Sequence, residues 1–170
     1  MDFSAFIEGL QGASGPEGRI RHLRLLPPRE AFFADVSHPL NPTFAAVLNS
    51  LGIERLWSHQ AEAVDLALDG KNVVVVAGTA SGKTLCYTIP IAQRIYSRPA
   101  SRALLLFPTK ALAQDQLRKL SDFGAGEAFT AATYDGDTPV AQRRRVKREA
   151  QVVLTNPDML HLGILPYHHT

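Results

Sequence analysis

The sequence of 170 residues is almost without cysteine, and its single thiol, Cys86, limits the chemistry of the chain. One cysteine can form neither an internal disulfide nor a cysteine zinc cluster within the chain. Cys86 follows closely on a glycine-containing segment, at the start of a predicted helix. We therefore expect it to be a small, buried core side chain rather than a reactive thiol.

Long apolar runs are also absent, since no segment approaches the roughly 20 consecutive apolar residues of a membrane span. The chain begins Met1-Asp2-Phe3, without the basic and apolar stretches of a signal peptide. We expect a cytoplasmic protein with no membrane partner. The net charge is only +2, so any contact with a nucleic acid must come from local clusters of charge.

Metal-binding patterns are missing as well. His161, His168 and His169 lie near one another, but Asp158 is the only acid close to them and no cysteine accompanies them. This set lacks the ligand spacing of a zinc site. We therefore expect no metal ion to be bound by these histidines.

The remaining composition, 45% hydrophobic and 20% charged, is typical of a globular protein of one domain. Residues 1–40 are predicted to form an irregular leader, because glycines and the Pro27-Pro28 pair interrupt regular patterns. Residues 41–170 are expected to form the domain. Its first helix is predicted to begin after Asn41 as its cap, with proline at the first helical position.

Strand-like and helical segments alternate along the rest of the domain. A second helix is predicted over residues 58–68, with Ser58 as its cap. Strands are predicted over 72–76, 103–107, 129–134 and 151–155, and helices over 82–96, 110–120 and 139–150. The first two strands contain continuous apolar runs, which are typical of strands covered on both faces. The alternation predicts an α/β fold with a mainly parallel sheet, whose ligands bind at the carboxyl ends of the strands.

The segment AGTASGKT, residues 77–84, directly follows the first predicted strand and predicts a nucleotide triphosphate site. Backbone N–H groups of such a loop, together with the start of a helix, surround an anion. Lys83 would reach the β- and γ-phosphates, and the Thr84 hydroxyl would ligate Mg²⁺. The residues expected to hold the phosphates are Gly78, Thr79, Ala80, Ser81, Gly82, Lys83 and Thr84. The general pattern begins with glycine where this chain has Ala77.

A glutamine lies ahead of this loop. Gln60 offers both a donor and an acceptor, which is what the edge of adenine requires. Trp57 fits either stacking on the base or packing in the core. His59 is expected to be a neighbour on the same helix with no catalytic role.

A second candidate site follows the second predicted strand. Pro108, Thr109 and Lys110 combine a hydroxyl, a cation and the start of a helix, which suits a backbone phosphate of a nucleic acid. The alternative is an ordinary helix start, with Thr109 as a cap and Lys110 in solvent. Residues 143–148 form a basic run, which suits either further phosphate contacts or a solvated helix face.

The order of these motifs resembles the first motor domain of superfamily 2 DEAD/DEAH-box helicases. Gln60, AGTASGKT, FPTKALAQDQL and Thr155-Asn156-Pro157-Asp158 are similar to the Q motif and to motifs I, Ia and Ib. TASGKT, FPTKALAQDQL, YDGDTP and LTNPDMLH together resemble the DNA-repair helicases of the bacterial mitomycin-repair type and their fungal relatives, which have a zinc-binding C-terminal domain.

The resemblance implies a P-loop NTPase (RecA-like) domain of three layers and assigns roles to its residues. Gln60 would contact adenine, and Thr155 and Gly136 would join Pro108, Thr109 and Lys110 in contacting a DNA strand. For Gly136, within Asp135-Gly136-Asp137, a tight acidic turn is an equal alternative. The implied cofactors are ATP and Mg²⁺. The implied partners are single-stranded or forked DNA, rather than RNA, and a second motor domain.

One element of the family pattern is missing from the sequence. The family continues with an Asp-Glu-x-His box that holds Mg²⁺ and positions water, whereas these residues contain no adjacent Asp-Glu pair. We therefore expect a sheet that is incomplete at the C-terminus, and ATP binding without hydrolysis by this chain alone. The alternatives are a non-catalytic truncated remnant and a small P-loop kinase, although such kinases usually place the loop close to the N-terminus.

Overall fold

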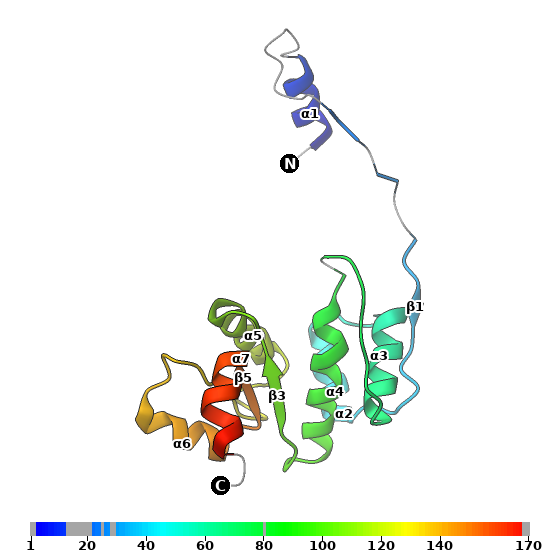
Figure 1. Ribbon diagram of the computed structural model, residues 1–170. Helices are drawn as coiled ribbons and strands as arrows, with labels where there is room; N and C mark the ends of the chain where they lie inside the picture. Colours follow the sequence, from blue (N-terminus) through cyan, green and yellow to red (C-terminus); the bar gives the residue numbers. More distant parts are fainter. Residues whose placement is uncertain (1–2, 13–21, 25, 28–29, 80, 168–170) are drawn as a thin grey trace. The chain divides into compact units, whose positions relative to one another are not determined.

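The computed structural model describes residues 3–12, 22–24, 26–27, 30–79 and 81–167. They belong to two units, residues 1–31 and 32–170, each of which is described by itself. In the first unit Phe3–Gly12 form helix α1 (Figure 1). The sequence predicted an irregular leader here and was wrong for this segment. Phe3, Phe6 and Leu10 recur at helical spacing, and this periodicity outweighs the two glycines of the helix.

The larger unit begins with a short antiparallel pair of strands, β1 (Phe33–Ala34) and β2 (Leu56–Trp57). Between them lies helix α2 (Pro42–Ser50). Its predicted cap is confirmed, because Asn41 Oδ1 accepts hydrogen bonds from the backbone N–H groups of Thr43 and Phe44, at 3.0 and 3.4 Å. The cap therefore satisfies two of the free donors at the helix start.

Two further helices complete the part of this unit that carries the phosphate loop. Helix α3 (Ser58–Leu68) has the predicted bounds, but its cap is Trp57 and Ser58 is the first helical residue. Helix α4 (Lys83–Ser97) follows the loop. The buried side chains Phe44, Leu48, Leu56, Ala61, Val64, Ile89, Ala92 and Phe123 form one core, which joins α2, α3 and α4.

A parallel sheet of three strands confirms the predicted α/β class. Its order is β3 (Ala103–Leu106), β5 (Val152–Thr155), β4 (Ala131–Thr133). Leu104 of β3 and Ala132 of β4 both lie in register with Val153 of β5. Because all three strands run in the same direction, their carboxyl ends lie at one edge of the sheet. The turns after these strands therefore lie close together.

The predicted strand 72–76 does not form in this structure. Residues 71–78 have no regular secondary structure, and Val74 and Val76 are 89% and 93% exposed. A strand gains its stability from hydrogen bonds to a neighbour and from a covered face. Among the described residues no strand pairs with this segment. The prediction of a strand was therefore wrong for this structure, because the neighbours that such a strand needs are not present in the described sheet.

The two faces of the sheet are covered unequally. Helices α4 and α5 (Lys110–Asp122) pack on one face, around a core that includes Ile95, Leu120 and Leu154. On the other face Leu104 and Leu106 are 45% and 47% exposed, so the expectation that this strand is covered on both faces was wrong.

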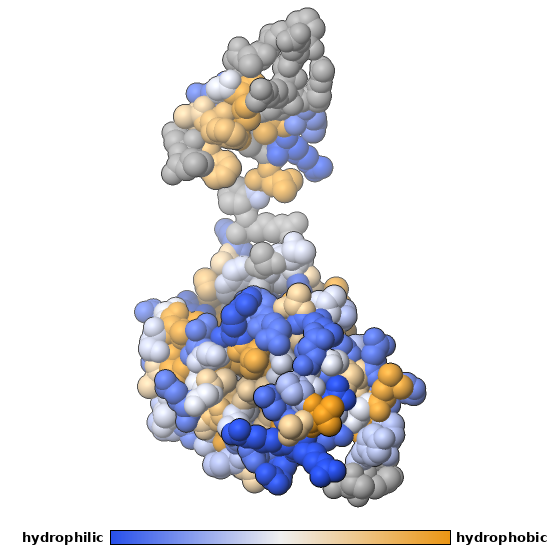
Figure 2. Space-filling model, turned by 90° about the vertical axis from the view of Figure 1, so that its left-hand side faces the viewer, coloured by the Kyte–Doolittle hydropathy of each residue, from blue (hydrophilic) through white to orange (hydrophobic). Residues whose placement is uncertain are grey.

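The open face is bordered by helix α6 and the last helical turns of the chain. These elements are α6 (Val140–Glu149), α7 (Pro157–Met159), a π-helical turn (Leu160–Ile164) and a 3-10 turn (Leu165–Tyr167). From the side of α6, the surface of the larger unit is mostly hydrophilic, with hydrophobic side chains scattered between (Figure 2). In the part of the chain that the structure describes, no helix has the length and apolar character needed to cross a membrane.

Candidate functional site

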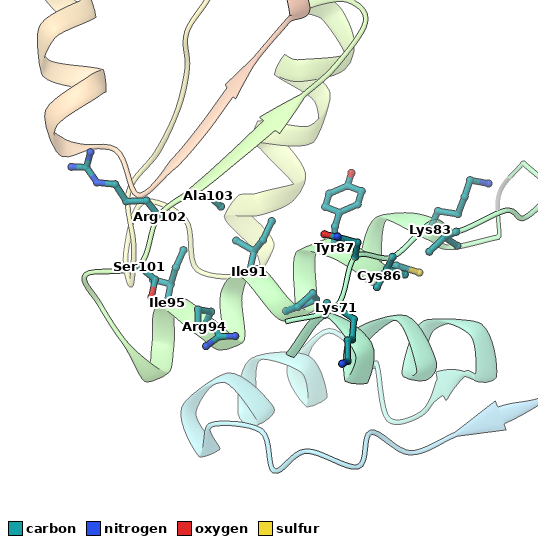
Figure 3. Close-up of a pocket in the computed structure, with 15 residues that line it drawn as sticks. Lys71, Lys83, Cys86, Tyr87, Ile91, Arg94, Ile95, Ser101, Arg102 and Ala103 are labelled. Carbon is teal, nitrogen blue, oxygen red and sulfur yellow. The ribbon is translucent and has the colours of Figure 1, made fainter. Parts of the chain in front are cut away.

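The predicted phosphate loop lies between the irregular segment after α3 and the first turn of α4. Gly78 and Thr79 are exposed, whereas Ala80, another predicted phosphate contact, lies outside the described residues. Lys83 is the first residue of α4 and its side chain turns back over the loop (Figure 3). Its Nζ donates to the carbonyl oxygens of Ala77, at 2.8 Å, and of Gly78, and to Ser81 Oγ at 3.2 Å. The ammonium group is thus held by oxygen atoms of the loop itself.

The first turn of α3 holds two consecutive carbonyl groups of the same loop. His59 Nε2 lies 3.0 Å from the backbone carbonyl oxygen of Ser81, and Gln60 Nε2 donates to the backbone carbonyl oxygen of Gly82 at 3.0 Å. Gln60 is only 4% exposed, and its Oε1 accepts a hydrogen bond from the Trp57 backbone N–H at 3.0 Å. Both ends of its amide are therefore engaged within the protein. Its predicted contact with adenine stays a prediction.

Sequence reasoning missed a contact of His59 and misplaced Trp57. His59 was expected to be a neighbour on the helix with no catalytic role, and the structure adds its contact with the backbone oxygen of Ser81. The Trp57 side chain is 42% exposed, so the core-anchor interpretation was wrong. Its ring lies edge-on to the His59 ring, with centroids 5.7 Å apart. The exposed Trp57 indole is accessible to a nucleotide base, and its stacking on adenine stays a prediction.

Thr84, the predicted magnesium ligand, is half-buried in the first turn of α4. Mg²⁺ in nucleotide sites is usually held by phosphate oxygens together with one or two carboxylates. Among the described residues no three His, Cys, Asp or Glu side chains form a cluster that could bind a metal ion. Thr84 and the phosphates of a nucleotide therefore fit a part of a magnesium site.

A cavity of about 750 Å³ lies behind the loop, between residues 71–75, α4 and the start of β3 (Figure 3). Tyr87, Ile91 and Ile95 of α4 line it together with Val73 and Val75. This space separates the unpaired segment from the free edge of β3. The strand-like sequence and the sheet thus face each other across an apolar cleft.

Cys86 also lines this cavity. The residue is buried, and its burial raises the pKa of the thiol, so the prediction of a core residue is confirmed.

The second candidate site lies at the carboxyl ends of the strands. Pro108, Thr109 and Lys110 are exposed where β3 ends and α5 begins. Thr109 caps α5, accepting a hydrogen bond from the Leu112 backbone N–H at 3.3 Å. Lys110 Nζ donates to Asp137 Oδ2 at 2.8 Å, and this hydrogen bond raises the pKa of the ammonium group.

The turn after β4 brings Gly136 beside this lysine. Asp135 is buried, and its Oδ1 accepts hydrogen bonds from the backbone N–H groups of Asp137 and Thr138, at 2.9 and 3.1 Å. A Cβ at Gly136 would lie 3.5 Å from Lys110 Nζ. The tripeptide is therefore a tight turn, as one interpretation predicted, and it lies at the predicted strand-contacting site as well.

Thr155 does not join these exposed groups. Its side chain is 1% exposed, and its hydroxyl donates to the Tyr134 backbone oxygen at 2.5 Å. In this conformation the hydroxyl is not available to a nucleic-acid strand. Asn156 caps α7 by accepting a hydrogen bond from the Met159 backbone N–H at 2.8 Å.

Several members of the basic run have structural contacts. Lys147 Nζ donates to the Gly163 oxygen at 2.6 Å and lies over the rings of Tyr134 and Tyr167, 5.4 and 5.2 Å from their centroids. Arg145 Nε lies 2.8 Å from Glu149 Oε2. The run is thus in part a structural element of the sheet's open face, and not only a solvated helix face.

Sequence reasoning also missed a histidine held between two acids. His38 Nδ1 lies 3.0 Å from Asp65 Oδ1, and its Nε2 lies 3.0 Å from Asp69 Oδ1. The hydrogen bond with Asp65 is the main cause that raises the pKa of His38 above its ordinary value. These two contacts attach the segment that precedes α2 to helix α3, which carries Gln60. No local pattern predicted it, because these residues lie far apart in the sequence.

Comparison with known proteins identifies the family. Residues 57–169 match the model of the DEAD/DEAH box helicase family. The uncharacterized ATP-dependent helicase YprA of Bacillus subtilis is 45% identical over 143 residues, which cover 83% of this chain and 19% of that protein. The ATP-dependent helicase hrq1 of Schizosaccharomyces pombe is 40% identical over 160 residues, which cover 90% and 15%. The chain spans less than a fifth of the length of these two relatives.

Solved structures agree with this result. The crystal structure of the DUF1998 helicase MrfA bound to DNA matches with a TM-score of 0.85 and 39% identity, over 99% of this chain and 24% of that one. The same helicase bound to DNA and AMPPNP matches with a TM-score of 0.84. The resemblance inferred from the sequence motifs and the RecA-like fold are thereby confirmed. The chain belongs to the DEAD/DEAH box helicase family.

Proposed function

We propose that residues 41–170 form part of the ATP-binding domain of a DNA helicase, and that residues 78–84 bind the phosphates of ATP with Mg²⁺. The observation that carries this proposal is the position of Lys83. Its ammonium group lies within the loop at the start of α4, where it is held by the Ala77 and Gly78 oxygens and Ser81 Oγ. Phosphate oxygens would replace these weaker acceptors, and the helix dipole would add to the attraction.

The Thr84 hydroxyl would ligate Mg²⁺ at the same helix start, and Mg²⁺ would neutralise phosphate charge there. The structure of a relative with bound AMPPNP supports the binding of a nucleotide by similarity. Gln60 contributes by holding the Gly82 oxygen, which keeps the loop against α3.

Calorimetric titration of the chain with ATP and Mg²⁺ tests this site. We expect measurable binding by the wild type and none by the Lys83→Ala variant. Lys71→Ala is the matched control, because Lys71 is an exposed lysine ahead of the loop. Equal binding by wild type and Lys83→Ala would refute the site. Equal loss in Lys71→Ala would show that general charge, rather than the loop, attracts the nucleotide.

The exposed groups at the strand ends are proposed to contact the backbone of single-stranded or forked DNA. Support comes from three features that meet there: the capped start of α5, the Lys110 ammonium group and the close approach of Gly136. Backbone N–H groups and lysine are the usual phosphate contacts of proteins on DNA. The relative whose structure contains DNA adds support by similarity. The role in DNA repair that the motif resemblance implies is part of this proposal.

Binding of a single-stranded oligonucleotide at several salt concentrations tests this contact. Lys110→Ala should weaken binding and lower the slope of log affinity against log salt by about 0.7, the value for one lost phosphate contact on a single strand. Lys119→Ala is the matched control, since Lys119 lies on the same helix in a similar 2.8 Å ion pair with Asp115. Equal effects of the two substitutions would refute a specific contact at Lys110.

Hydrolysis is proposed to need the longer protein. Phosphoryl transfer relies on metal, lysine and arginine groups that act together, and these residues contain no adjacent Asp-Glu pair of the kind that the family uses to hold the metal. We therefore expect no ATP turnover by these 170 residues. Turnover that is lost in Lys83→Ala would overturn this part of the proposal, whereas turnover that persists in Lys83→Ala would indicate a contaminating enzyme.

A further inference from the structure

The contact between His59 and the phosphate loop has a consequence for the direction of the loop's N–H groups. In a trans peptide the carbonyl and the following N–H point in opposite directions. His59 Nε2 lies 3.0 Å from the Ser81 oxygen, so the Gly82 N–H of the same peptide plane points away from α3. Gln60 holds the Gly82 oxygen at 3.0 Å, so the Lys83 N–H also points away from α3.

These two N–H groups lie at the start of α4, where the first backbone donors have no partner within the helix. Gly82 is the cap of α4, with φ +70°, and Lys83 is the first helical residue. Two consecutive planes turned in this way present two donors on one side of the loop. Such an arrangement forms an anion-binding concavity.

We propose that His59 is a positioning residue of the phosphate site: its Nε2–H, bonded to the Ser81 oxygen, orients the Gly82 N–H toward the phosphates of the nucleotide. The inference rests on the proposed nucleotide site and deepens it, because it adds a residue that acts through the backbone of the loop. The Ser81 oxygen is an acceptor only, so the neutral imidazole must have its proton on Nε2. The edge-on Trp57 ring packs against the imidazole and restricts its rotation.

Three substitutions at this position separate hydrogen bonding from packing. His59→Gln places an amide nitrogen the same number of bonds from Cα as Nε2, and should retain nucleotide affinity. His59→Asn places its amide nitrogen one bond closer to the backbone and should not reach the Ser81 oxygen. His59→Leu keeps the bulk of the side chain without a donor. We expect Asn and Leu at this position to weaken binding about five-fold, the effect of one net hydrogen bond.

The probes are ATP with Mg²⁺, followed by calorimetry, and inorganic tripolyphosphate, followed by the amide resonance of Gly82. Tripolyphosphate has no base, so it reports on the phosphate loop without any contribution from adenine. We expect this resonance to shift in the wild type and in His59→Gln, and to shift less in His59→Leu at equal saturation. Thermal melting of each variant shows whether the fold is retained.

The outcomes distinguish this inference from the proposed function. If the wild type binds neither ATP nor tripolyphosphate, the nucleotide site itself is refuted and the role of His59 with it. If the wild type binds and folded His59→Leu binds equally well, only the positioning role is refuted. A neutral His59 with its proton on Nδ1, as reported by the ring nitrogen resonances, would also overturn it.

Discussion

Replacing Gly82 by alanine should disturb both the backbone and Gln60, and the size of the effect follows from the structure. Gly82 has φ +70°, where a side chain costs about 1 kcal/mol or more. An added Cβ would lie 2.3 Å from Gln60 Nε2, so the amide must move. It would lose its bonds to the Gly82 oxygen and the Trp57 N–H, and a buried amide without partners costs about 1–3 kcal/mol.

The total is about 2–4 kcal/mol of the free energy of unfolding, which for a chain of this size lowers the melting temperature by roughly 10 °C. Thermal and urea unfolding measure it. Gly70→Ala is the matched control, because Gly70 has φ +77° and an added Cβ would meet no described atom within 4 Å. It should cost only the backbone part, about 1 kcal/mol.

The same substitution in a Gln60→Ala background isolates the clash. There Gly82→Ala should cost about as much as Gly70→Ala, because the amide that it displaces is gone. The reasoning is refuted if Gly82→Ala costs no more than Gly70→Ala in the wild type. It is also refuted if removing Gln60 leaves the cost of Gly82→Ala unchanged.

Three further predictions concern other parts of the larger unit. The hydrogen bond with Asp65 raises the pKa of His38, so the contacts of His38 with Asp65 and Asp69 stabilise the fold fully below the ordinary pKa of 6.5. This stabilisation is lost as the pH rises through the raised pKa. The melting temperature should therefore fall from pH 6 to pH 9 by more in the wild type than in His38→Asn. Equal slopes would contradict this. Thr155→Val should cost about 1–3 kcal/mol in urea unfolding, because the Tyr134 oxygen loses its donor in a buried site, and no loss would show that another donor replaces it. The free edge and open face of β3 should cause the protein to self-associate at high concentration, which analytical sedimentation measures. A monodisperse monomer with cooperative melting would disprove this prediction.

The sequence predicted those parts of the fold that depend on local chemistry. Asn41 and Thr109 cap their helices because each presents a short side-chain oxygen to free N–H groups. The parallel strands follow from apolar runs separated by helical segments. The placement of Lys83 at the start of α4 also follows from the loop sequence.

The parts that failed depend on long-range partners. Residues 72–76 have the apolar pattern of a strand, but a strand needs neighbours that a local pattern cannot reveal. The local pattern likewise did not reveal that the Thr155 hydroxyl is buried against the Tyr134 backbone oxygen, which comes from another strand end, and its contact with a nucleic acid stays a prediction. The contact of His59 with Ser81 was equally hidden, because it joins residues from two helix starts.

The most direct test of the account is a crystal structure of the chain with AMPPNP and Mg²⁺. We predict that the β- and γ-phosphates lie between the Lys83 ammonium group and the Gly82 and Lys83 N–H groups, that Lys83 Nζ has left the Ala77 and Gly78 oxygens, and that the His59–Ser81 contact is retained. A nucleotide bound elsewhere, or a Lys83 side chain still folded onto the loop with the phosphates distant from it, would contradict the central claim that this loop is the ATP site.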